Sequence, residues 1–329
     1  MVRGKMSILV KSEMKSQFAA AYDLVQQSQR IILTSHEYTD GDDLGSVLAL
    51  ARVFEGQGKT VWSMALGGVP ENLLFLPGHS DVHDRLPEDF ADYDLLVTLG
   101  CGVLSRTGFA ELEPWSKPIL NIDHHHDTQM FGTVNVWDET RAANCELVYV
   151  MLKDWRVEID KAVALSLLTG IFTDTGGFRH ANVTASTLEI AADLLRRGAR
   201  LDLISRFITS QKDLPKLRVW SMALEHARFD EKHRVVYTVV TAEDLEKAGA
   251  REEDLEGVVE LLNTIPEAKF SMLLKQRGSE VKGSLRSEPY KGVDVSEIAR
   301  SFGGGGHKLA AGFKFKGSIE KTESGWRIS

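Results

Sequence analysis

Residues 30–57 read RIILTSHEYTDGDDLGSVLALARVFEGQ, and this stretch decides the fold. The apolar run at 30–35 predicts a buried strand, and the apolar spacing within 44–57 predicts a helix. The polar segment 36–43 joins the two. In open α/β sheets, ligands bind in loops at the carboxyl ends of parallel strands, so this segment is a candidate binding loop.

The same alternation of strand and helix continues outward from this segment. Further strands are expected at 60–65, 94–99 and 118–122, and helices at 146–153, 162–174 and 184–197. Continuous apolar strands alternating with helices imply a parallel sheet covered on both faces. The sequence therefore predicts an α/β amino-terminal domain over residues 1–200.

The pattern of predicted strands and helices changes after residue 200. Residues 203–229 predict a long helical connector, and we place the linker at 201–222. The following segments predict strands at 233–241, 269–275 and 280–286, with short helices at 242–248 and 257–264. We therefore expect a second, smaller α/β domain over residues 223–329, with a cleft between the two domains.

Composition narrows the class of protein. The 329 residues are 43% hydrophobic and 26% charged, which is ordinary for a globular chain. The net charge of −8 argues against a long nucleic-acid duplex as partner, because such binding needs a broad basic surface. No apolar run is long enough to cross a bilayer, and the first residues lack the apolar core of a signal peptide. With only two cysteines, we expect a cytoplasmic protein with free thiols and no membrane partner.

The loop after the first strand carries His36, Asp40 and Asp42. One imidazole and two carboxylates in seven residues can converge on divalent cations. Gly41 allows a tight turn, so that the two carboxylates can reach different ions. The alternative is a polar turn in which an Asp caps the following helix.

Two further clusters follow predicted element ends. Residues 121–126 read NIDHHH, and the three histidines can divide the roles of metal ligand, phosphate contact and bystander, with Asp123 orienting one imidazole. Asp174 precedes two glycines at the end of a predicted helix. Taken alone, the first cluster could be a run of surface histidines, and Asp174 could simply cap a helix. Together the three clusters predict a shared metal site.

A fourth cluster lies near the end of the chain, where residues 303–307 read GGGGH. Such a run exposes backbone N–H groups that suit a phosphate, and His307 adds a cationic side chain. Upstream, Arg286 on a predicted strand suits bidentate phosphate contact. Residues 265–316 hold ten Lys and Arg against five Asp and Glu. The alternatives are a flexible linker and a solvated basic face.

This ordered set resembles the DHH phosphoesterases, in the subgroup that includes nano-RNases, 3′-phosphoadenosine 5′-phosphate phosphatases and cyclic-dinucleotide phosphodiesterases. The resemblance implies two divalent cations, with Mn²⁺ preferred over Mg²⁺ or Co²⁺. It implies His36 and Asp40 as ligands of one ion, and Asp42, His124 and Asp174 as ligands of the other. The catalytic set that it implies is His125, Asp123 and Arg286. The substrate-binding set is Arg106, Arg286, Gly304, Gly305, Gly306 and His307.

The chain departs from this family at one position. Aligned on Arg106, Gly100 stands where the family has an Asp that bridges both ions. We therefore expect reduced metal occupancy and slow turnover, and Gly100→Asp is expected to raise both unless the backbone there suits only glycine. Asp43 stands where the family has a small residue and could compensate in part. Cys101 is expected to point to the opposite face of the strand.

The function that the resemblance implies is the metal-dependent hydrolysis of phosphate esters of short nucleotides. The substrate class covers oligoribonucleotides, dinucleotides such as pApA, and 3′-phosphoadenosine 5′-phosphate. Two alternatives stay open: a catalytically weak nucleotide-binding homologue, and a polyphosphate or pyrophosphate hydrolase. A homodimer is compatible with the sequence, which does not determine the oligomeric state.

Overall fold

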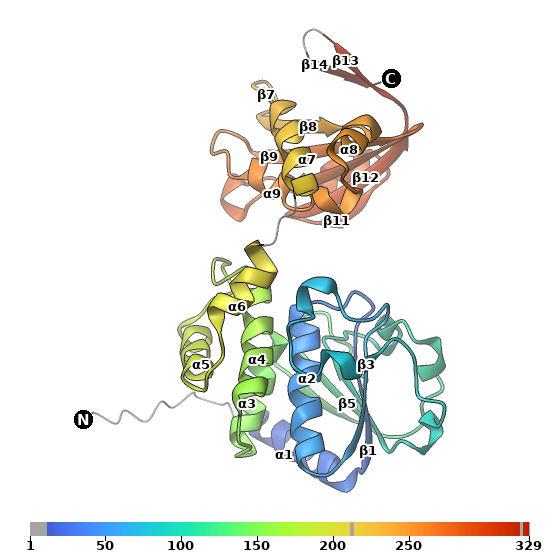
Figure 1. Ribbon diagram of the computed structural model, residues 1–329, viewed down its shortest axis with the longest axis vertical. Coiled ribbons are helices and arrows are strands. Elements are labelled where there is room, and N and C mark those ends of the chain that lie inside the picture. Colours follow the sequence, from blue (N-terminus) through green and yellow to red (C-terminus); the bar gives the residue numbers. More distant parts are fainter. Residues whose placement is uncertain (1–11, 211–213, 323–324, 329) are drawn as a thin grey trace, which may run out of the picture. The chain divides into compact units, whose positions relative to one another are not determined.

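The computed structural model describes residues 12–210, 214–322 and 325–328. The chain divides into two compact units, residues 1–211 and 212–329 (Figure 1). Residues 1–11 of the expected amino-terminal domain and 211–213 of the expected linker lie outside the described residues.

The first unit is built on a six-stranded sheet in the order β3-β2-β1-β4-β5-β6, with every neighbouring pair parallel. The strands are β1 (Arg30–Ser35), β2 (Thr60–Met64), β3 (Val82–His83), β4 (Leu95–Leu99), β5 (Ile119–Asp123) and β6 (Val134–Trp137). The parallel sheet predicted from the sequence is confirmed. The two edge strands were not predicted, because runs this short give no periodic signal.

Helices cover one face of this sheet, and turns cover the other. The helices are α1 (Ser12–Gln27), α2 (Gly41–Gly56), α3 (Asn144–Asp154), α4 (Lys161–Asp174), α5 (Ala185–Arg196) and α6 (Leu201–Ser205). Alternate strand residues such as Ile31 and Leu33 pack in the core with helical side chains. Ile32 and Leu96 face the other way, into a smaller core with Phe109 and Leu112 from the loops and short 3₁₀ turns after β4.

The prediction of one long connecting helix over 203–229 is wrong. Helix α6 passes into a π-helical turn at Arg206–Ser210, and a separate helix α7 spans Leu214–Glu225 before strand β7 at Arg228–Asp230. The Thr209 hydroxyl donates to the Ser205 carbonyl at 2.8 Å, a local bond that accompanies the altered turn. Within the second unit, Val219 is fully buried in a hydrophobic core, so α7 belongs to that unit.

The second unit holds a mixed sheet in the order β11-β12-β10-β9-β8-β7. The remaining strands of this sheet are β8 (Val235–Val240), β9 (Phe270–Arg277), β10 (Glu280–Arg286), β11 (Gly305–His307) and β12 (Ala310–Lys316). Only the β8–β9 pair is parallel among the paired strands described here. The helices are α8 (Ala242–Ala248), α9 (Val258–Asn263) and α10 (Val295–Ser301), and a hairpin of β13 (Ile319–Thr322) and β14 (Gly325–Ile328) follows.

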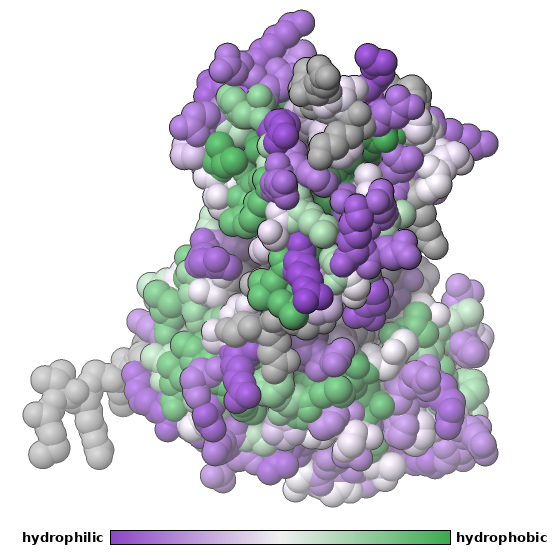
Figure 2. Space-filling view, turned by 45° about the horizontal axis from the view of Figure 1, so that its top comes forward, coloured by the Kyte–Doolittle hydropathy of each residue, from purple (hydrophilic) through white to green (hydrophobic). Residues whose placement is uncertain are grey.

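The surface of both units is mixed. Figure 2 shows hydrophilic residues over much of the visible surface, interspersed with smaller hydrophobic areas. Among the helices described, none combines the length and the apolar character that a membrane span requires.

Candidate metal centre

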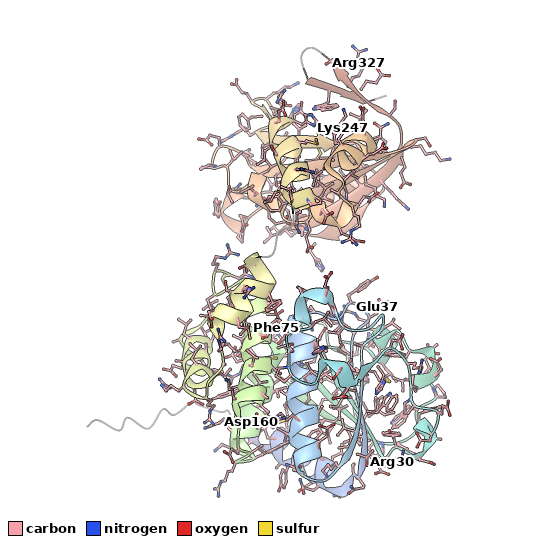
Figure 3. The ribbon with its side chains drawn as sticks, in the orientation of Figure 1. Arg30, Glu37, Phe75, Asp160, Lys247 and Arg327 are labelled. Carbon is pink, nitrogen blue, oxygen red and sulfur yellow. The ribbon has the colours of Figure 1, made fainter. Side chains whose placement is uncertain are left out.

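The candidate site lies at the carboxyl-terminal ends of the strands of the first sheet. Figure 3 labels Arg30 at the start of β1 and Glu37 just beyond its end, and the two lie at opposite edges of the sheet. Helix α2 begins immediately after this edge, with Asp40 as its N-cap. Asp40 Oδ1 accepts hydrogen bonds from the backbone N–H groups of Asp42 and Asp43, at 2.9 and 3.0 Å. The cap that the sequence offered as an alternative reading therefore exists, and it leaves the second oxygen of Asp40 unused by the helix.

The first ligand group consists of His36, Asp40 and Asp43. One potential ligand atom from each lies within 4.8 Å of the others. The Nδ1 atom of His36 accepts the backbone N–H of Tyr38 at 3.1 Å, which leaves Nε2 to face the carboxylates. Sequence analysis placed His36 and Asp40 together, and the structure brings Asp43 into the same group.

The second ligand group consists of Asp42, His124 and Asp174, whose ligand atoms also lie within 4.8 Å of one another. His124 Nε2 is 3.6 Å from Asp42 Oδ2 and 3.4 Å from Asp174 Oδ2. His124 follows β5, and Asp174 is the last residue of α4. Three elements far apart in the sequence thus supply one cluster.

Backbone groups that sequence reasoning missed hold this second group in place. The carboxylate of Asp42 accepts the N–H groups of Asn144 at 2.6 Å and Cys145 at 2.8 Å, and so caps α3 from another element. The N-cap residue of α3, Ala143, provides no capping side chain. His124 Nδ1 lies 3.2 Å from the carbonyl oxygen of Arg141, which fixes the ring with Nε2 toward the carboxylates. The absence of a capping side chain at the start of α3 is the one sequence signal that could have indicated that a residue from elsewhere, here Asp42, caps this helix.

The carboxylates of the two groups are crowded and buried. Burial raises the pKa of Asp42, and burial with the charges of Asp40 and Asp42 holds the pKa of Asp43 well above its usual range. Burial, followed by the charges of Asp42, Asp40 and Asp43, raises the pKa of Asp174 to about 10. The fold crowds carboxyl groups here without enough neighbouring positive charge to keep all of them ionised. Carboxylate and imidazole donors in this arrangement fit divalent cations.

His125 lies beside the ligand groups with a different set of partners. Its Nδ1 is 2.7 Å from Asp123 Oδ1, and the Thr128 hydroxyl donates to Asp123 Oδ2 at 2.6 Å. The hydrogen bond to Asp123 raises the pKa of His125, which favours its protonated, positively charged form. Asp123 therefore orients His125 rather than the ligating His124. Burial, with a smaller contribution from the charge of Arg106, lowers the pKa of His36, and the same charge opposes the rise in the pKa of His125. The Arg106 guanidinium is therefore within electrostatic reach of the site.

Gly100 and Cys101 differ from their expected geometry. Strand β4 ends at Leu99, and Gly100 has a φ of +66°, in the left-handed region that favours glycine. A Cβ atom added at Gly100 would lie 2.2 Å from Asp43 Oδ1. Cys101 therefore lies beyond the strand, fully buried, with its thiol donating to the Leu99 carbonyl. The exception attached to the Gly100→Asp expectation, a backbone that suits glycine, therefore applies.

In the second unit, Arg286 and the glycine run 303–306 were expected to contact the substrate, and both make contacts within the unit that the sequence did not predict. Arg286 Nε donates to Glu260 Oε1 at 2.8 Å, so the guanidinium is partly committed to a carboxylate. The glycine run is not an open loop throughout, because Gly305–His307 forms the edge strand β11 paired with β12. A Cβ at Gly304 would lie 2.1 Å from the Gly312 carbonyl oxygen, so close packing requires glycine there. His307 is exposed at this edge.

Comparison with known proteins places this geometry in context. The chain matches the DHH family, N-terminal domain, over residues 30–171 and the DHHA1 domain over residues 232–324. It is 35% identical to the bifunctional oligoribonuclease and PAP phosphatase NrnA of Thermus thermophilus, over 87% of this chain and 84% of that protein.

Solved structures share this fold. The crystal structure of an exopolyphosphatase-related protein from Bacteroides fragilis has a TM-score of 0.82 and 25% identity, covering 95% of this chain and 94% of that one. A crystal structure of exonuclease RecJ bound to manganese has a TM-score of 0.53 and 16% identity, covering 94% and 91%, and supports the fold alone.

Proposed function

The chain belongs to the DHH family, and we propose that it is a divalent-metal-dependent hydrolase of phosphate esters of short nucleotides. The observation that carries the proposal is the pair of ligand groups at one edge of the parallel sheet. Each group offers imidazole and carboxylate ligands for a cation. Two Mn²⁺ ions are the proposed occupants, with Mg²⁺ or Co²⁺ as alternatives.

The ions, when bound, would lower the pKa of a water molecule and offset the negative charge of the phosphate. The chain's own residues supply the rest. His125, held by Asp123 and Thr128, offers a positively charged imidazole next to the ligand groups, where it can donate to a phosphate oxygen. Arg106 adds a second cation in the same unit. We assign Arg286, His307 and the glycines 304–306 to binding the nucleotide, in keeping with the basic balance of residues 265–316.

The proposed substrates are oligoribonucleotides, dinucleotides such as pApA, and 3′-phosphoadenosine 5′-phosphate. The name of the Thermus relative joins an oligoribonuclease and a phosphatase of the last compound, and the match covers both units of this chain. The similarity to an exopolyphosphatase-related protein keeps polyphosphate as a second candidate substrate.

The test is a turnover assay on metal-stripped protein reconstituted with Mn²⁺. The substrates are pApA, 3′-phosphoadenosine 5′-phosphate, polyphosphate and a long RNA duplex, with products separated by chromatography. We expect AMP from the first two, with phosphate from the second, and no cleavage of the duplex. Faster turnover of polyphosphate than of either nucleotide would favour the second candidate. Nucleotide binding without turnover of any substrate would identify a binding protein and contradict the proposal.

The run of three histidines provides a matched pair of variants. His124→Ala removes a proposed ligand, while His126→Ala removes an exposed neighbour. Loss of a group that only orients a ligand costs about 10–100-fold. His124→Ala is therefore expected to lose roughly 100-fold or more in turnover, and His126→Ala to retain it. Equal effects of the two substitutions would rule out the assigned ligand group.

A further inference from the structure

The Asp43 carboxyl group is buried, and one of its oxygens lacks a partner in the described part of the chain. The residue is 3% exposed and lies in the first turn of α2, with its side chain toward the sheet edge rather than solvent. His36 Nε2 is 2.8 Å from Asp43 Oδ2. Despite this short distance, Oδ2 has no hydrogen-bond partner in the described part of the chain. An uncompensated buried carboxylate is costly, so such a group calls for a cation.

Asp43 also determines what position 100 can hold. Asp43 Oδ1 lies 2.2 Å from the point where any Cβ at Gly100 would stand. The next residue near that point is His36, whose Cδ2 lies 3.8 Å away. A side chain at the end of β4 and the carboxylate from α2 therefore compete for one volume beside His36. In this chain the Asp43 carboxylate from α2 occupies this volume, and position 100 has no side chain.

We propose that Asp43 is a metal ligand, that it supplies from α2 the carboxylate which the end of β4 lacks, and that Gly100 is required because the two positions share one space. The inference rests on the proposed function only for the identity of the ion. It gives the His36 ion three protein ligands and removes the reason to expect reduced occupancy. The chain then binds two ions despite the glycine.

The experiment measures Mn²⁺ binding to metal-stripped protein by calorimetry, with metal content after desalting as a second readout. The wild-type chain is expected to bind two ions. Asp43→Asn keeps the shape of the side chain but removes its charge, and should weaken one of the two binding events by roughly 100-fold, at least as much as the loss of an orienting group. Asp81→Asn, at an exposed position of the same unit, serves as the control and should bind as the wild type does.

The exchange between positions 43 and 100 gives the sharper test. Gly100→Asp alone should lower metal binding, because the new Cβ collides with the Asp43 carboxylate. The double variant Asp43→Ala with Gly100→Asp frees that volume and returns a carboxylate to it, and Asp tolerates a left-handed backbone better than most residues. The double variant should therefore regain the second ion that each single variant loses, and circular dichroism checks that all variants are folded.

Two results would overturn the inference. One is unchanged binding of both ions by folded Asp43→Asn. The other is a folded double variant that binds no more metal than Asp43→Ala, which would show that the two positions do not share one role. These outcomes are separate from failure of the proposed function. A wild-type protein that binds two ions and hydrolyses no nucleotide leaves the Asp43 assignment intact.

Discussion

The Asp42 carboxylate accepts the backbone N–H of Cys145 at 2.8 Å and joins the second ligand group to the first turn of α3. The same carboxylate also accepts the N–H of Asn144. A side chain that sequence alone would assign only to metal binding therefore also caps a helix that has no capping side chain of its own.

This dual role predicts that Asp42→Ala will expose the start of α3. Removing a helix cap costs about 1 kcal/mol, which corresponds to roughly fivefold faster local exchange. Hydrogen exchange measured in EDTA should show faster exchange at Asn144 and Cys145. The matched variant His124→Ala removes a ligand of the same group but no acceptor of these amides, and it should leave their exchange unchanged. Equal exchange in Asp42→Ala and wild type would contradict the cap.

Metal binding should release protons. The pKa of Asp174 lies at about 10 in the absence of metal, so this carboxyl is protonated at neutral pH and must lose its proton when a cation binds. Mn²⁺ affinity is therefore expected to rise with pH. Calorimetry at pH 7 in buffers of different ionisation enthalpy measures the release directly. A binding heat that is independent of the buffer would argue against a protonated Asp174.

Bound metal should also stabilise the first unit. A ligand at 100 times its dissociation constant stabilises the state that binds it by about 2.7 kcal/mol. The thermal transition of the protein should rise with added Mn²⁺ and fall again with EDTA. His124→Ala should reduce the rise, and His126→Ala should not. A transition that does not respond to Mn²⁺ would mean that the folded state does not bind the ion more tightly than the unfolded chain.

Arg286 provides a test in the second unit. Its side chain is partly committed to Glu260 and still carries donors for a phosphate. Arg286→Ala is expected to weaken nucleotide binding by roughly 1.5–3 kcal/mol, the range for a hydrogen bond to a charged group. Lys247→Ala, which removes an exposed cation of the same unit (Figure 3), is the control. Calorimetry with a non-cleaved nucleotide distinguishes the two, and equal affinities would remove Arg286 from the binding set.

A pH-dependent contribution to stability is expected far from the site. Asp94 Oδ2 accepts the N–H groups of Gln29 and Arg30, each at 2.8 Å, at the start of β1. The bonds from Arg30 and then Gln29 lower the pKa of Asp94 below 3.8. Because the folded pKa is the lower one, the stabilisation is present above the unfolded value and is lost as the pH falls through the folded value.

Asp94→Asn should therefore be destabilised by about 1 kcal/mol at pH 7, a value reduced for solvent exposure. The difference from wild type should shrink as the pH falls below about 4. Urea unfolding at several pH values measures it. A difference that is constant from pH 7 to pH 2 would show that the ionised carboxylate is not what stabilises this strand start.

Much of the fold follows from patterns that are readable along the chain. Strand β1 has the bounds predicted from its apolar run, and β10 has those predicted from a pair of strands joined by a turn. The loops that follow β1 and β5 contain the expected ligands. The connector at 203–229 was wrong because its helical spacing cannot reveal a π-helical turn or the pairing of Arg228–Asp230 with β8. Periodicity reports local structure, and these features depend on packing against other elements.

The site was harder to predict where it depends on three-dimensional neighbours. His36 and Asp40 lie six residues or fewer from the end of β1, so a strand-loop-helix pattern suffices to group them. The shared volume of Asp43 and Gly100 depends on how α2 meets the end of β4, and a backbone φ of +66° leaves no mark in the sequence except the glycine itself. The amides that hold Asp42 come from a helix about 100 residues away and are independent of side-chain identity.

Anomalous diffraction from crystals grown with Mn²⁺ shows whether both ligand groups together form one two-ion centre. We expect two manganese peaks about 3.5–4 Å apart, the separation of two-metal hydrolytic sites. One peak should contact His36, Asp40 and Asp43, and the other should contact Asp42, His124 and Asp174. A single peak, or two peaks of which neither contacts Asp43, would contradict this expectation.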